Sequence, residues 1–192
     1  MALIKTSAQG LTADATNLVK ISTATLNGDT SAEFDLDSTY EHFLFRFSAI
    51  HISADTDNFE VDFSLTSDTD YGSATITYMG SRNYQSEISG TGTAGNVFNS
   101  STGTSSKARL ANSVSADNDH SIDGTFEIYN PSNTTFTKGF RGECNYMQSG
   151  NNTMRTVTHG DIRNATAVDK IKFFMESGNM ASGKITQYGI KI

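Results

Sequence analysis

Apolar and polar residues alternate with a period of two along much of this 192-residue chain. In residues 42–48 every second residue is a phenylalanine, and residues 58–65 place Phe59, Val61, Phe63 and Leu65 at alternate positions. Successive side chains of a β-strand point to opposite faces of a sheet, so this alternation predicts two strands, each with one buried face. The polar link between them is short enough to join an antiparallel pair.

The same alternation recurs in several later segments. We expect further strands near residues 74–78, 122–129, 136–146 and 154–158, and a final pair at 168–175 and 185–192 around the polar turn 177–183. No window of about 15 residues carries a helical stripe, and at most one short helical turn is expected, near residues 166–170. Roughly eight to ten strands at this spacing predict an all-β fold, an antiparallel two-sheet β-sandwich of jelly-roll type.

Two segments depart from this pattern. Residues 1–33 are polar and rich in threonine, and we interpret them as an N-terminal arm and first strand that serve in attachment. Residues 86–107 are rich in Gly, Ser and Thr with few apolar side chains, which predicts a long, flexible, exposed loop in the β-sandwich domain of residues 34–192. Such a loop is either simply solvated or contacts a partner, and both interpretations stay open.

Charge and apolar content limit the partners. The formal net charge is −7 and no Lys/Arg stripe occurs, so we expect no binding to a nucleic-acid backbone. No stretch approaches the ~18 apolar residues of a membrane span, and the N-terminus does not have the pattern of a secretory signal. We therefore expect no membrane insertion. Cys144, the single cysteine, sits in an alternating segment and is predicted to be a small buried hydrophobe.

Catalytic motifs are missing from the sequence. The chain has no G-x-S-x-G, P-loop, G-x-G-x-x-G or H-E-x-x-H pattern, and its four histidines, His42, His51, His120 and His159, are not at ligand spacing. We expect no enzyme activity and no cofactor. A hydrolase would need His120 to meet a carboxylate and a nucleophile in the folded chain.

Short acidic clusters begin at Asp55, Asp68 and Asp117. Calcium prefers several loop oxygens of this kind, but a calcium loop that began at Asp55 would need Gly and Glu where Glu60 and Thr66 stand. The competing interpretation is turn chemistry, in which Asp and Asn side chains bond nearby backbone groups. No metal ligand is assigned.

Aromatic residues offer the remaining candidates for recognition. Tyr71, Tyr78 and Tyr84 lie close to the predicted loop and could form a rim that contacts a glycan or a partner, although strand tyrosines with one wet end are common. Phe98 and Phe174 fall outside the buried phase and are candidates for a subunit interface.

Several segments together resemble a domain that recurs in structural proteins of tailed bacteriophages. The resemblance is carried by the Tyr-led strand Tyr40–Phe47, DTDNFEVDFSL, GTFEIYNPSNTTF, AVDKIKFF, SGNMASG and the terminal YGI, over roughly residues 34–192. The resemblance implies a β-sandwich on the virion surface, as in tail fibres, receptor-binding proteins and head-decoration proteins. It implies no enzyme activity and supplies no catalytic residue.

One difference from these proteins shapes the functional expectation. Many of them carry the domain at the end of a long fibre, whereas here only about 33 residues precede it, which favours a small accessory subunit. We expect a non-enzymatic virion structural protein, either head decoration (cement) or a tail adhesin, that serves assembly, stability or host attachment. Its expected partners are the major capsid or tail proteins, two further copies in a homotrimer, and a host surface glycan. It would be made in the host cytoplasm and end on the virion surface. The alternative is a free carbohydrate-binding module.

Overall fold

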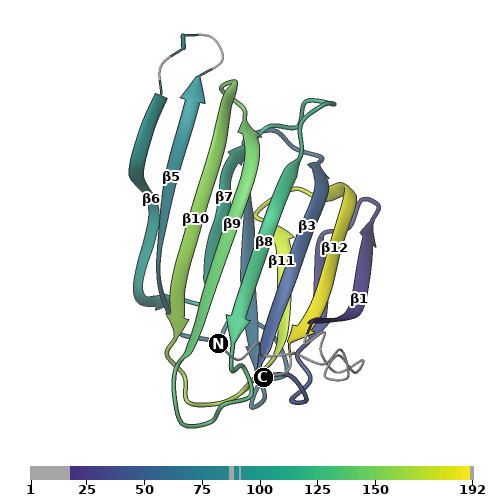
Figure 1. The fold of residues 1–192 in the computed structure, drawn as a ribbon, viewed down its shortest axis with the longest axis vertical. Coiled ribbons are helices and arrows are strands. Elements are labelled where there is room, and N and C mark those ends of the chain that lie inside the picture. The colour runs from purple at the N-terminus through teal and green to yellow at the C-terminus, as the bar shows by residue number, and fades with distance from the viewer. Residues whose placement is uncertain (1–17, 87–88, 91, 191–192) are drawn as a thin grey trace, which may run out of the picture.

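The computed structural model describes residues 18–86, 89–90 and 92–190, which form twelve β-strands (Figure 1). The strands are β1 (Leu18–Leu26), β2 (Ser31–Asp35), β3 (His42–Ile52), β4 (Asp57–Leu65), β5 (Ile76–Ser86), β6 (Gly92–Ser105), β7 (Lys107–Val114), β8 (Ile122–Tyr129), β9 (Lys138–Gln148), β10 (Asn152–Ile162), β11 (Val168–Met175) and β12 (Met180–Ile190). No helix occurs among the described residues, so none there could cross a membrane. The all-β prediction is confirmed.

All strand pairs are antiparallel and belong to one nearly closed sheet. Eight strands run in the order β1-β12-β3-β8-β9-β10-β5-β6, and the other four run β7-β4-β11-β2. A single residue pair, Val114 with Gln148, joins β7 to β9 and so connects the two runs. In Figure 1 the eight-stranded run faces the viewer, with β7 and β11 behind it.

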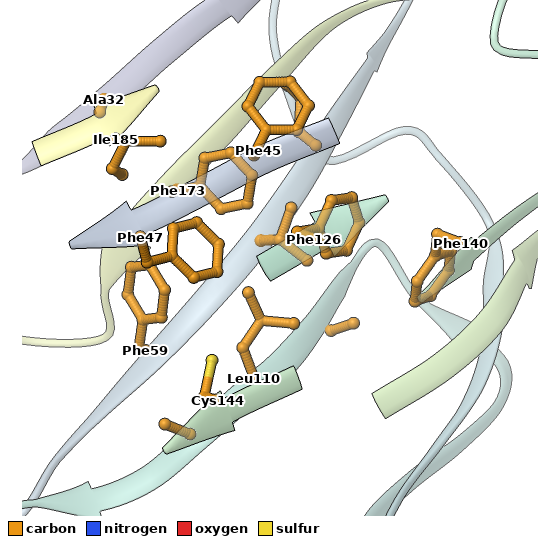
Figure 2. Packing of buried hydrophobic residues seen from close by; sticks show 14 of the residues in the cluster. Ala32, Phe45, Phe47, Phe59, Leu110, Phe126, Phe140, Cys144, Phe173 and Ile185 are labelled. Atoms are coloured by element: carbon orange, nitrogen blue, oxygen red, sulfur yellow. The ribbon is translucent and has the colours of Figure 1, made fainter. Parts of the chain in front are cut away.

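Phenylalanines fill the space between the two runs. The predicted phase is confirmed, because Phe43, Phe45 and Phe47 of β3 are each at most 1% exposed. The ring centroids of Phe45 and Phe173 lie 5.1 Å apart, as do those of Phe47 and Phe59 (Figure 2). These edge-to-face contacts join β3 of the longer run to β11 and β4 of the shorter run, and so hold the sheet folded back on itself.

Side chains of β9 and β10 satisfy backbone groups along β7, where direct pairing with the longer run is reduced to one residue pair. Thr156 Oγ1 donates to the carbonyl of Leu110 at 2.6 Å, and Thr158 Oγ1 donates to that of Arg109 at 2.8 Å. Both threonines are buried. These hydroxyls replace the missing strand partner, because a buried carbonyl without a hydrogen bond is costly.

The side chain of Gln187 also forms hydrogen bonds between strands that do not pair with each other, here β1 and β2. Its side-chain nitrogen donates to the carbonyl of Asp35 in β2 at 2.7 Å, and its oxygen accepts from the hydroxyl of Ser22 in β1 at 2.9 Å. Gln187 is 2% exposed. One buried amide therefore joins the two terminal strands of the sheet.

Several details differ from the sequence prediction, beginning with the number of strands among the described residues, which is twelve rather than eight to ten. The segment 86–107, predicted to be a flexible loop, contains the 14-residue strand β6, which pairs with β5. Threonine and serine in an edge strand can face solvent on both sides, so the apolar alternation that marks a buried strand is not needed there. The predicted helical turn at residues 166–170 is wrong, since β11 begins at Val168.

The predicted domain boundary falls inside an element, because β2 spans Ser31–Asp35. The first strand expected within the arm corresponds to β1, and residues 1–17 lie outside the described part of the chain. β1 pairs with β12 and β2 pairs with β11. Residues 18–35 are thus integral to the sheet.

Candidate binding face

The outer side of strands β5, β10 and β9 forms an exposed polar surface, which we call the polar face. Its side chains alternate with buried ones: Arg155, His159 and Asp161 of β10 are exposed, whereas Thr156 and Thr158 are buried. β10 pairs with β5 on one side and β9 on the other, so this row lies in the middle of a sheet. An uncovered, charged row on a central strand marks a surface that is available to a ligand.

Three hollows lie along the polar face. One of about 270 Å³ is lined by Asn83, Tyr84, Gln85, Asn145, Thr153, Met154 and Arg155. Two overlapping hollows of about 320 Å³ each lie farther along the same strands, lined by Thr77, Thr137, Asp161 and Arg163, and by Thr77, Tyr78, Met79, Ser100, His159, Gly160 and Asp161. Most of the lining residues carry amide, hydroxyl or charged groups, but the accessible surface of the first and third hollows is mainly apolar, which suits an extended ligand that has both polar groups and apolar faces.

Two arginines of this face share one carboxylate. Arg155 Nε lies 2.8 Å from Glu143 Oε1, and Arg141 Nη2 lies 3.7 Å from Glu143 Oε2. The hydrogen bond from Arg155 is the main cause that holds the pKa of Glu143 below its usual value. The side chains of Arg141 and Arg155 remain 57% and 54% exposed, so both guanidinium groups face solvent while Glu143 orients them.

The three tyrosines suggested by the sequence are not gathered into one rim. Tyr78 is 7% exposed, and its pKa is raised by burial. Tyr84 lies six residues farther along β5, roughly 20 Å away at the rise of a strand, and packs against the core. Tyr71 precedes β5 and lies against Lys172, whose Nζ is 4.1 Å from the ring centroid. Tyr84 lines the first hollow of the polar face, and Tyr78 lines one of the other two.

A second charged cluster was not anticipated from the sequence. Glu60 and Asp62 of β4 are 3% and 7% exposed although they alternate with core residues. Lys107 Nζ lies 2.6 Å from Glu60 Oε2, and Arg109 Nη2 lies 3.3 Å from Glu60 Oε1. Burial raises the pKa of Asp62. The spacing of Lys107 and Arg109, two apart on one strand, was a usable signal for this cluster.

A further hollow, of about 360 Å³, lies beside this cluster at the end of β2 and β11. Phe174 lines it, and the amines of Lys107 and Lys172 lie 5.6 and 5.3 Å from its ring centroid. Phe174 is half-buried beneath these two amines, and its place at a subunit interface stays a prediction. The side chain of Phe98 lies outside the described residues.

Aspartates of the acidic clusters accept hydrogen bonds from backbone nitrogens of loop residues. Asp57 Oδ2 accepts from the nitrogen of Gly178 at 2.6 Å, and Asp55 Oδ1 accepts from that of Ala116 at 3.1 Å. His120 lies 3.8 Å from Asp117 and 3.6 Å from Asp119, both of them exposed. Within the described residues, no three His, Cys, Asp or Glu side chains are grouped as metal ligands.

The edge strand β1 exposes apolar side chains. Leu18, Val19 and Ile21 are 46%, 39% and 39% exposed, and among the described strands β1 pairs with β12 alone. The pairing shifts register between Lys20 and Ser22, which marks a bulge. An exposed apolar edge is typical of a strand that meets another chain, while bulges and lysines limit uncontrolled pairing.

Comparisons of the chain with protein-family models, curated proteins and solved structures found no match. The functional argument therefore rests on the residues themselves.

Proposed function

We propose that this protein is a non-enzymatic accessory subunit on the surface of a tailed-bacteriophage particle. It would act as head decoration (cement) or as a tail adhesin, bound to the major capsid or tail proteins. The finer architecture, a two-sheet sandwich of jelly-roll type, belongs to this proposal, and the folding of the β7-β4-β11-β2 run behind the longer run supports it.

Contacts among the segments that carry the resemblance support the proposal most directly. Tyr40, which opens the first of these segments, covers Gly189 of the YGI segment so closely that a Cβ there would lie 2.4 Å from the ring. The carbonyl of Pro131, in the IYNPS segment, accepts from the nitrogen of Val168, which begins the VDKIKFF strand, at 2.8 Å. The resemblance therefore follows one interlocked unit rather than unrelated stretches.

The surface of the molecule suits such a role. The apolar edge of β1 offers a seat for other subunits, including further copies in a homotrimer, while the polar face remains free to meet a host surface glycan. These two surfaces lie on different strands of the same rigid sheet. Attachment and recognition can therefore proceed at the same time.

Immunoelectron microscopy of purified particles tests the proposal. Antibody label on heads would assign decoration, and particles that lack the protein should then lose resistance to heat and low salt. Label on tails would assign an adhesin, and particles without it should fail to adsorb. Absence of label from intact particles would overturn the virion assignment.

A free carbohydrate-binding module is the second candidate, because the polar face has the hydroxyl and amide lining that a sugar chain would need. Under this alternative the isolated protein would bind glycan and no particle would contain it. Mass spectrometry of purified virions separates the two candidates.

A further inference from the structure

We propose that the polar face binds a polyanionic glycan, a sugar chain that carries carboxylate or phosphate groups. This inference deepens the surface role proposed above and rests on it. Arg141, Arg155 and Arg163 would contact the anionic groups, and Asn83 and Asn145 would contact sugar hydroxyls.

The first argument is the arrangement of the arginines. Arg155 and Arg163 stand on the outward phase of β10 and just beyond its end, eight residues apart, which is roughly 26 Å along a strand. Arg141 pairs with His159 across β9 and β10, between these two positions. The cationic groups are thus spread along the strand direction, which suits a chain with repeated anionic groups better than a single small ligand.

The second argument is that the guanidinium groups retain donors for a ligand. Arg155 uses Nε for Glu143, and Arg141 approaches that carboxylate only at 3.7 Å. Glu127, opposite Arg141 on β8, accepts from Tyr129 Oη at 2.6 Å. Arginine presents several donors in a planar fork that matches carboxylate and phosphate oxygens. An anion can therefore dock without displacing the existing contacts.

The third argument is charge contrast. The whole chain carries a formal charge of −7, whereas β5, β9, β10 and Arg163 together place three arginines and two carboxylates, Glu143 and Asp161, on the polar face, and Glu127 of the adjoining β8 lies opposite Arg141. The gathering of arginines on one face makes that face less repulsive to anions than the rest of an acidic protein.

The composition of the face separates a glycan from other polyanions. The apolar side chains on the outward phase of these three strands are Met79, Met147 and Val157, too few to form the core of a protein interface. Single-stranded nucleic acid is held mainly by stacking on exposed aromatic rings, whereas Tyr78 beside one hollow is buried and Tyr84 beside another is half-buried and packs against the core. Amide side chains beside the arginines instead suit sugar hydroxyls.

The test measures binding of the purified full chain to fluorescent polymers. Polygalacturonate and poly(glycerol phosphate) serve as anionic probes, dextran as the neutral probe, and a thymidine oligonucleotide as the nucleic-acid probe. We expect at least one anionic probe to bind, with affinity that falls as salt rises, and dextran and the oligonucleotide to bind at least about tenfold more weakly. Binding of polygalacturonate would identify carboxylates as the recognised groups, and binding of poly(glycerol phosphate) would identify phosphates.

Substitutions on the polar face test whether the probe binds there. Arg141→Gln with Arg155→Gln should weaken binding by about tenfold or more. Lys170→Gln removes an exposed cation from β11, in the other run of strands, and should change binding less than about twofold, which makes it the control. Asn83→Asp adds a repelling charge to the same hollow and should also weaken binding.

Equal binding of dextran or the oligonucleotide, no binding of either anionic probe, or full binding by the double arginine variant would each overturn this inference. Virion location is measured separately: labelled particles with no glycan binding would refute the inference alone, whereas glycan binding without labelled particles would refute the virion assignment.

Discussion

The phenolic oxygen of Tyr146 lies 3.1 Å from the backbone nitrogen of Asn112 and 3.2 Å from its carbonyl oxygen. One hydroxyl thus accepts from the N–H and donates to the C=O of the same residue in β7. Tyr146 is 4% exposed, so water cannot readily replace either bond. Burial also raises the pKa of Tyr146, which keeps the hydroxyl protonated as a donor.

Removing this hydroxyl should destabilise the fold. We expect Tyr146→Phe to lower the free energy of unfolding by about 1–3 kcal/mol, because it leaves a buried N–H and C=O without partners. Urea unfolding followed by circular dichroism measures the change. Tyr129→Phe is the control, since its hydroxyl bonds Glu127 at the surface, and we expect a loss below about 0.5 kcal/mol there. Equal effects of the two variants would contradict the role given to Tyr146.

The buried amide of Gln187 should be similarly sensitive. Gln187→Met keeps the side-chain length but removes the bonds to Asp35 and Ser22, and we expect a loss of about 1–3 kcal/mol. Hydrogen exchange should show faster exchange in β1 and β2 than in β4. Gln85→Met, at an exposed position of β5, is the control and should leave both stability and exchange unchanged.

The contact between Tyr40 and Gly189 leaves no room for a side chain. Gly189→Ala should destabilise the protein by about 2–4 kcal/mol, because the new Cβ would lie 2.4 Å from the ring of Tyr40. Tyr40→Ser removes the ring, so alanine at Gly189 should cost much less in that background. A double-mutant cycle measures this coupling. Additive losses would show that the clash is not the cause.

Lys138 gives the fold a pH dependence. Its amine is 0% exposed and donates to the carbonyls of Asn164 and Thr166 at 2.7 and 2.6 Å. Desolvation lowers the pKa of Lys138 in the folded protein. Between that pKa and the ordinary value of 10.5 the unfolded chain binds more protons, so this group makes stability rise with pH.

We therefore expect the difference in unfolding free energy between the wild type and Lys138→Met to grow in favour of the wild type as pH approaches 10. Lys138→Met should also be less stable at neutral pH, because two carbonyls lose their donor. The free energy of unfolding is measured against pH for both proteins. The difference between the two curves removes the contributions of the other titrating groups. A difference that is flat with pH would contradict the lowered pKa.

Cys144 should be inert in the folded state. Its side chain is 0% exposed, which confirms the sequence prediction, and burial raises the pKa of the thiol. A thiolate is the reactive form, so a disulfide reagent should label the protein only at the rate at which it opens. Labelling in urea gives the reference rate. Fast labelling of the native protein would mean that β9 opens locally.

Prediction from sequence succeeded for the strands in which burial of one face imposes an alternation of apolar and polar residues. The phenylalanines of β3 and β4 were placed correctly because a half-buried strand needs apolar residues at every second position. β6 was missed because its partner, not its own composition, holds it extended. Glu60 and Asp62 alternate with the core residues of β4, on the phase that a half-buried strand would expose, and Glu60 is buried beside the cross-strand cations Lys107 and Arg109.

The polar face was also beyond sequence reasoning. Arg141 and Arg155 are 14 positions apart, and only the register of β9 and β10 brings them to one surface around Glu143. By contrast, Thr156 and Thr158 gave a signal that could have been used. They occupy the inward phase between Met154 and Ile162, where a hydroxyl needs a buried acceptor.

The pairing of β1 with β12 also determines when β1 can join the sheet during synthesis of the chain. Leu26 meets Gly183, so β1 has no partner in the described sheet until β12 has been synthesised. At usual elongation rates this interval is on the order of 10–30 s, during which the backbone of β1 is unpaired. Folding must end with closure of this long-range pair, which makes it slow and dependent on a nascent chain that stays soluble.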